Sequence, residues 1–101
     1  MARFLNPKSL ITFQKNVTTS GTPVQLTAYD VPDGVSFVVK AKNANTGTIT
    51  IGSSSANALN TDTVHFKLLN NQSVSLQLAN TDLVWIDSTV SGEGVECILE
   101  Y

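Results

Sequence analysis

The chain has 101 residues, a formal net charge of −2 and a single cysteine. This length accommodates one domain with a modest core, the negative charge excludes a general affinity for nucleic acid, and a lone cysteine excludes an internal disulfide. Charged residues make up only 14% of the chain. The Thr, Ser, Asn and Gln residues that take their place suit strands, turns and a weakly charged surface.

Residues 1–20 contain several apolar side chains, interrupted by Asn6-Pro7 and followed by a polar stretch at Thr18-Thr19. This pattern favours a first edge strand over residues 9–17 and leaves residues 1–8 as an arm. The stretch lacks the apolar run of roughly 7–15 residues that a signal peptide needs. No segment of the chain approaches the roughly 18 apolar residues of a membrane span. We therefore expect synthesis in a cytoplasm and no membrane partner.

From residue 21 onwards, apolar and polar residues alternate with period two in short runs. These runs occupy residues 24–28, 35–41, 49–51, 64–68, 74–78 and 95–101, and a further run at residues 83–86 is apolar throughout. No window of about eleven residues shows a helical stripe. The sequence therefore predicts an all-β fold, in which residues 21–101 form a single antiparallel, jelly-roll-like β-sandwich of about 7–8 strands. Residues 1–20 are expected to supply an N-terminal arm, a first edge strand or both.

Turn signals separate the runs, at Pro32-Asp33-Gly34, Asn45-Thr46-Gly47, Asn70-Asn71 and Ser91-Gly92-Glu93-Gly94. Such residues favour reversals of the chain because they tolerate turn conformations. Asn45-Thr46-Gly47 predicts a hairpin between the runs at residues 35–41 and 49–51. Gly52 is expected to open a polar loop that continues to about Asp62. The run at residues 83–86 is continuously apolar and predicts a strand that is covered on both faces.

The residues that could carry chemistry do not assemble into a recognisable catalytic set. His65 falls on the outer face of its run, which favours a surface residue over a catalytic or metal-binding one. Glu96 and Glu100 would lie about 13 Å apart on a regular strand, which is too far for a glycosidase pair. Asp33 fits ordinary turn chemistry better than a calcium site. The sequence predicts that the protein is no enzyme and needs neither a cofactor nor a metal.

Two further residues have a structural and a functional interpretation. Cys97 is in phase with Val95 and Leu99, so it reads as a small buried apolar residue. Trp85 lies between Val84 and Ile86, which favours a place in the core. An exposed Trp85 would instead offer a stacking platform for a glycan.

An ordered set of motifs resembles a group of small tailed-phage virion proteins. The strings are "GVSFVVKAKNANTGTITIG" at residues 34–52, "SVSL" at residues 73–76 and "NTDLVWIDS" at residues 80–88. In that group an apolar strand ends in Ala and is followed by N-T-G, I-x-I-G, x-S-V-x-L and D/N-L-x-x-I/V-D. The matching positions are Ala41, Asn45-Thr46-Gly47, Ile49, Ile51-Gly52, Ser73-Val74, Leu76, Asp82-Leu83 and Ile86-Asp87.

The resemblance implies a virion structural protein of the capsid decoration, or cement, type. Proteins of this type are β-sandwich domains on the outer capsid surface, often homotrimers, that tie neighbouring major capsid protein subunits together. Two alternatives stay open. One is a neck, tail or head-fibre module of the virion, and the other is a carbohydrate-binding β-sandwich that uses Trp85 or Tyr29.

Contact with the capsid is expected from the N-terminal segment and from the polar loop after Gly52. An N-terminal arm could order on docking or pair as an added strand along a sheet edge. For Leu10 and Ile11, completion of the protein's own core is the favoured alternative. The candidate contact residues are Phe4, Leu5, Leu10, Ile11, Ser53, Ser54, Asn57 and Leu59.

Overall fold

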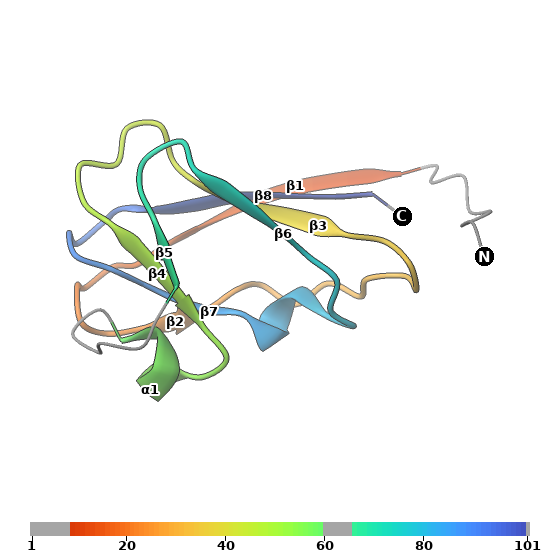
Figure 1. The fold of residues 1–101 in the computed structure, drawn as a ribbon, viewed down its shortest axis with the longest axis horizontal. Helices are drawn as coiled ribbons and strands as arrows, with labels where there is room; N and C mark the ends of the chain where they lie inside the picture. Colours follow the sequence, from red (N-terminus) through yellow and green to blue (C-terminus); the bar gives the residue numbers. More distant parts are fainter. Residues whose placement is uncertain (1–8, 60–65, 101) are drawn as a thin grey trace.

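The computed structural model describes residues 9–59 and 66–100 (Figure 1). These described residues contain two short helical turns, α1 (Ser55–Ala58) and the 3-10 turn η1 (Thr81–Leu83). No helix in the described ranges has the length and apolar character needed to cross a membrane. The strands are β1 (Leu10–Asn16), β2 (Val24–Gln25), β3 (Phe37–Ala41), β4 (Ile49–Gly52), β5 (Phe66–Leu68), β6 (Ser73–Leu76), β7 (Trp85–Ser88) and β8 (Gly94–Glu100).

The strands of the described ranges form two antiparallel sheets of four strands each. Sheet A has the order β1-β8-β3-β6 and sheet B has the order β2-β7-β4-β5. Four of the pairings are nested, because β1 pairs with β8, β2 with β7, β3 with β6 and β4 with β5. A long hairpin rolled up into two layers has this pattern, which is the topology of a jelly roll. The predicted all-β, jelly-roll-like sandwich is therefore confirmed.

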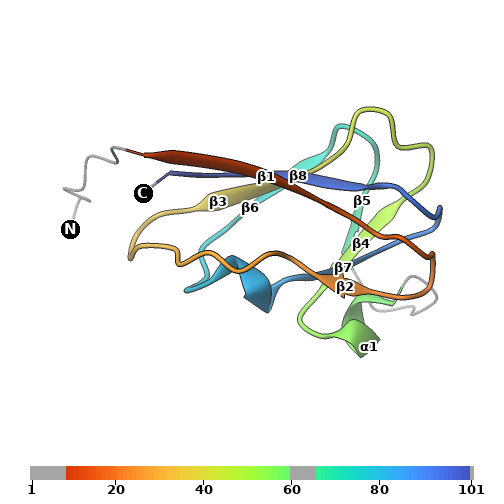
Figure 2. The ribbon, with the colours of Figure 1, turned by 180° about the vertical axis from the view of Figure 1, so that it is seen from behind.

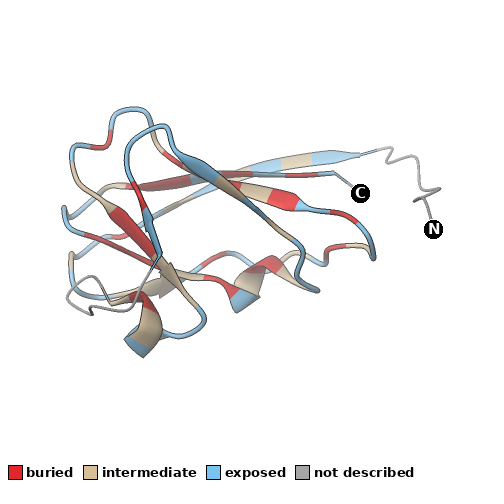
Figure 3. Ribbon diagram, in the orientation of Figure 1, coloured by how far each residue is buried: buried red, intermediate tan, exposed pale blue. Residues whose placement is uncertain are grey.

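The core lies between the two sheets, because strands of both sheets contribute buried residues to one hydrophobic cluster (Figure 3). On β8, Val95, Cys97 and Leu99 are buried, whereas the intervening residues are exposed. This alternation follows from the strand geometry, in which successive side chains point to opposite faces of the sheet. Phe37 and Ile86 are completely buried and come from sheets A and B respectively. Each buried side chain of this size stabilises the fold by about 1.5–3 kcal/mol.

The segment around Asn45-Thr46-Gly47 does not close a hairpin. It follows β3, which belongs to sheet A, and precedes β4, which belongs to sheet B. Residues 42–48 therefore cross from one layer of the sandwich to the other. The predicted hairpin is wrong because turn residues specify that the chain reverses, and not which strand it pairs with afterwards.

Three other sequence expectations also need correction. The run at residues 83–86 is not a strand covered on both faces, since Leu83 lies in η1 and is 50% exposed. The run at residues 24–28 keeps only two residues in a strand. The polar loop after Gly52 contains the turn α1, whose four residues are too few to produce a helical stripe in the sequence.

The connections of the sandwich gather at its two ends (Figure 2). The β1–β2, β3–β4, β5–β6 and β7–β8 connections lie at one end. The β2–β3 and β6–β7 connections lie at the other end, together with the start of β1 and the end of β8. This arrangement determines which polar residues can act together at the surface.

Candidate contact surfaces

We call the first candidate surface the loop end; it comprises residues 17–23, 42–48, 69–72 and 89–93. Main-chain hydrogen bonds join the connections to one another. Val17 N–H donates to the carbonyl of Glu93 at 2.8 Å, and Gly92 N–H donates to the carbonyl of Val17 at 2.7 Å. Asn71 N–H donates to the carbonyl of Ala41 at 3.1 Å, and the Asn71 side-chain amide donates to Asn43 Oδ1 at 2.8 Å. The four connections are held as one unit.

Glu93 fastens the β3–β4 connection to the β7–β8 connection. Its Oε2 accepts from Thr46 N–H at 2.7 Å and from the Thr46 hydroxyl at 2.9 Å, and its Oε1 accepts from Gly47 N–H at 2.8 Å. The hydrogen bond from the Thr46 backbone is the largest cause that lowers the pKa of Glu93, because it stabilises the ionised carboxylate. Asn45 adds a second link, donating from Nδ2 to the carbonyl of Gly94 at 2.8 Å.

Gly47 is required by the close packing of these two connections. A Cβ atom at this position would lie 2.3 Å from Thr89 Oγ1 and 2.7 Å from Val90 Cγ2. Neither distance is compatible with non-bonded contact, so a larger residue would force the side chains of Thr89 and Val90 to move. The Asn45-Thr46-Gly47 motif therefore shapes the loop end through one buried amide, one hydrogen-bonded threonine and one glycine.

The loop end presents an almost uncharged surface. Lys42 and Glu93 are the only charged residues among its four segments, and both are engaged in hydrogen bonds. Two large apolar residues are exposed among the polar ones, Leu69 at 54% and Val90 at 37%. Small neutral polar side chains around exposed apolar ones are a composition suited to contact with another protein.

The second candidate surface is the α1 turn, which contains four of the predicted contact residues. Ser54 is the N-cap of α1, and its hydroxyl accepts from Asn57 N–H at 3.2 Å. Asn57 Oδ1 accepts in turn from Ser53 N–H at 3.1 Å. Ser53 and Ser54 are exposed, whereas Asn57 and Leu59 are half-buried. The structure brings the four residues together, but three of them use polar atoms to form the turn itself.

The third candidate surface is the start of β1. Leu10 is 59% exposed and Ile11 is half-buried, on opposite faces of the strand. The alternative interpretation expected Leu10 to complete the protein's own core, and its exposure shows that it does not. Phe4 and Leu5 lie outside the described residues. The start of β1 and the α1 turn belong to different sides of the sandwich (Figures 1 and 2), so they do not form one continuous contact surface.

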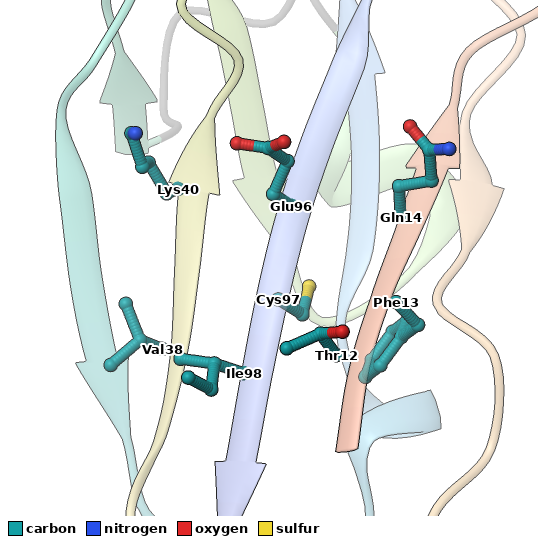
Figure 4. A pocket seen from close by; sticks show the side chains of 8 residues that line it. All are labelled: Thr12, Phe13, Gln14, Val38, Lys40, Glu96, Cys97 and Ile98. Atoms are coloured by element: carbon teal, nitrogen blue, oxygen red, sulfur yellow. The ribbon is translucent and has the colours of Figure 1, made fainter. Parts of the chain in front are cut away.

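An open depression of about 500 Å³ lies over β1, β8 and β3 of sheet A (Figure 4). Lys40, Glu96 and Gln14 form one row across the strands, and Val38, Ile98 and Thr12 form the next. Lys40 and Glu96 are register partners, an arrangement in which opposite charges stabilise a strand pair. The face thus combines an apolar centre at Ile98, which is 41% exposed, with a charged row beside it.

Residues singled out for chemistry are dispersed over the structure. Trp85 is half-buried on β7, and Tyr29 packs against Phe13 with a ring-centroid distance of 4.9 Å. Within residues 9–59 and 66–100, no three His, Cys, Asp or Glu side chains gather in a way that could hold a metal ion. His65 lies outside the described residues.

Comparisons with models of protein families, with curated proteins and with solved structures find no match to this chain. The fold and surface define the class of the protein as a jelly-roll sandwich whose loop end is weakly charged and joined by hydrogen bonds.

The loop end was not among the surfaces that the sequence predicted. Its separate turn signals were all visible in the sequence, at residues 45–47, 70–71 and 91–94. Their shared location depends on the rolled-up strand order, which places alternate connections at the same end of the sandwich. A turn signal carries no information on that order.

Proposed function

We propose that the protein is a structural component of a tailed-phage virion and decorates the outer capsid surface by binding neighbouring major capsid protein subunits. The loop end is the observation that carries this proposal. Its four connections are tied by hydrogen bonds between residues far apart in the sequence. A surface that is already ordered loses little conformational freedom on docking, so more of the contact free energy contributes to affinity.

The motif resemblance supports the same proposal. Asn45-Thr46-Gly47, the most distinctive matching motif, forms part of the loop end and is locked to Glu93. A jelly roll is compatible with this function, because capsid and lectin domains both use this fold. The fold by itself does not select between them. The half-buried position of Trp85 and the packing of Tyr29 against Phe13 do not favour a glycan platform.

Decoration would stabilise the capsid by mass action. A protein that binds only the assembled shell adds about 2.7 kcal/mol per site at a hundredfold excess over its dissociation constant. The chain needs no catalytic group for this effect. It needs a surface that keeps its shape and excludes water when it docks.

Cosedimentation with empty capsids assembled from the major capsid protein tests the proposal. Leu69, exposed at the loop end, and Leu83, exposed on η1 at the opposite end, provide a matched pair because their exposed fractions are 54% and 50%. We expect Leu69→Asp to weaken capsid binding about tenfold or more, because it removes apolar contact and introduces a charge into the interface. Leu83→Asp should bind like the wild type.

Absence of any binding by the wild-type protein to intact capsids would overturn the proposed function. Wild-type binding that Leu69→Asp leaves unchanged would overturn the assignment of the loop end as the docking surface. Far-UV circular dichroism of both variants shows whether they retain the fold. The copy number per virion distinguishes decoration from a neck ring, because a neck ring cannot hold hundreds of copies.

A further inference from the structure

Strand β1 is the longest open sheet edge in the described part of the protein. The two sheets have four edge strands, of which β2, β5 and β6 have two, three and four residues, whereas β1 has seven. β1 pairs with β8 on one side, and no described residue pairs with its other side (Figure 2). Proteins usually keep edge strands short or charged, because an open edge is a template for a further strand.

The register of sheet A identifies the backbone groups that face outward from this edge. Val17 follows β1 directly, and its N–H donates to the carbonyl of Glu93, which precedes β8, so this pair is hydrogen-bonded. The neighbouring residue Gly94 turns its carbonyl to the other side of β8, where it accepts from Lys42 N–H. Because hydrogen-bonded and non-hydrogen-bonded pairs alternate in antiparallel strands, every second residue of β1 has its N–H and C=O directed away from β8. These outward-facing residues are Leu10, Thr12, Gln14 and Asn16.

We propose that the open edge of β1 binds β1 of a second copy of this chain in the antiparallel direction. Full overlap of the two strands pairs Leu10 with Asn16 and Thr12 with Gln14 of the second copy, which are all outward-facing residues. It places Phe13 opposite Phe13 on the two-fold axis, in a non-hydrogen-bonded pair where side chains come closest. The two four-stranded A sheets then join into one continuous sheet.

The side chains of β1 suit pairing with themselves. Lys15 is the only charged residue of the strand, and it would lie opposite Ile11, whose side chain can pack against the aliphatic part of the lysine. The two Lys15 residues would be about 13 Å apart along the strands, four residues at the usual rise. On the solvent-exposed face of sheet A, the four β1 side chains of each copy are uncharged; they are Leu10, Thr12, Gln14 and Asn16.

Opposite charges also face each other across the paired strands. The Lys42 ammonium reaches the β1 edge, where it donates to Gln14 Oε1 and, at 2.7 Å, to Asn16 Oδ1. In the paired arrangement Asn16 lies beside Leu10 of the second copy, and Glu100 is the register partner of Leu10 within each copy. Glu100 of the second copy therefore lies about 10 Å beyond Asn16, two strand spacings away, on the same exposed face as Lys42. This complementarity favours a second copy over an unrelated extended segment.

Sedimentation velocity of the purified protein between about 5 and about 200 µM tests the inference, since mass action favours the dimer as concentration rises. We expect a concentration-dependent monomer–dimer equilibrium. Thr12→Pro removes an outward-facing N–H and should weaken dimerisation about tenfold or more. Ser75→Pro is the matched control on β6, because Ala41 N–H donates to Gln72 O and the same alternation directs the Ser75 N–H away from β3. Ser75→Pro should dimerise like the wild type.

Charge reversal tests the register of the pairing. Glu100→Lys should weaken the dimer, and the double variant Lys42→Glu with Glu100→Lys should recover it, with both effects reduced by salt. A wild-type protein that stays monomeric at the highest concentration overturns the inference. So does a trimer, because this pairing is two-fold and closes at two copies, unlike the trimer implied by the family resemblance. A dimer that is unaffected by Thr12→Pro also overturns it, and none of these outcomes depends on capsid binding.

Discussion

The carboxylate of Glu93 accepts hydrogen bonds from both the backbone N–H and the hydroxyl of Thr46, although 47 positions separate the two residues. This contact joins the β3–β4 connection to the β7–β8 connection, and both of these cross from one sheet to the other. It explains how two short polar segments, each rich in turn residues, hold one conformation at the loop end.

The stability of the protein should depend on pH through Glu93. Its pKa is lower in the folded protein than in the unfolded chain, chiefly because of the Thr46 backbone hydrogen bond. The stabilisation is therefore present above the unfolded pKa of Glu93 and is lost as the pH falls through the folded value. Glu93→Gln should lower Tm at pH 7, and its difference from the wild type should shrink at acidic pH. Thermal unfolding between about pH 2 and 7 measures this; an equal difference at every pH would contradict the prediction.

Gly94 should be the glycine least tolerant of substitution among those of the β7–β8 region. An added Cβ would lie 2.0 Å from the carbonyl oxygen of Lys15 and 2.7 Å from Asn16 Cα, which are both backbone atoms. Gly94→Ala should destabilise the protein by about 3 kcal/mol or more, because β1 must move away from β8. Gly92→Ala is the comparison: its Cβ would meet no atom within 4 Å, and its φ of +86° alone should cost about 1 kcal/mol. Urea unfolding that ranks the two variants in the opposite order would refute this.

Asp87 should stabilise the β1–β2 connection through its buried carboxylate. It is completely buried on β7, and its Oδ1 accepts from Ser88 N–H at 2.8 Å and from Gly21 N–H at 3.1 Å. Asp87→Ala removes the acceptor and should cost about 2–3 kcal/mol. Asp87→Asn keeps an oxygen acceptor of the same shape and should cost less. Chemical denaturation of both variants checks the ranking, which fails if the two lose equal stability.

Cys97 should be unreactive in the folded protein. It is buried on the inner face of β8, and burial raises the pKa of its thiol to about 12. At pH 8 only about one molecule in ten thousand would carry the reactive thiolate. A chromogenic disulfide reagent should therefore react slowly with the native protein and rapidly in strong denaturant. The Cys97 thiol ionises at a lower pH in the unfolded chain than in the folded protein. The stability of the fold should therefore decline as the pH rises from the ordinary thiol pKa towards the higher pKa of Cys97 in the folded protein.

Much of the fold could be predicted from local sequence. The period-two alternation on Val95, Cys97 and Leu99 reports which side of a strand is buried, because side chains alternate between faces whatever the strand pairs with. The same reasoning applies to Phe37, Val39 and Ala41, which are all completely buried. An all-β sandwich follows from several such runs separated by turn residues.

The contact surfaces could be predicted only in part. Ser53, Ser54 and Asn57 do lie together, because they are close in the sequence. The engagement of their polar atoms in the α1 turn could not be foreseen, since hydroxyl and amide groups can serve a cap or a partner equally well.

The sequence by itself determined most of the strands, their inward faces and the positions at which the chain turns, because these depend on residues only a few places apart. Only the tertiary structure decided that Asn45-Thr46-Gly47 joins two sheets, that Glu93 locks it there and that β1 is left with a long open edge. These features depend on which distant strands pair. Nested pairing of β1 with β8 and of β4 with β5 is a property of the whole rolled chain, and no local run of residues encodes it.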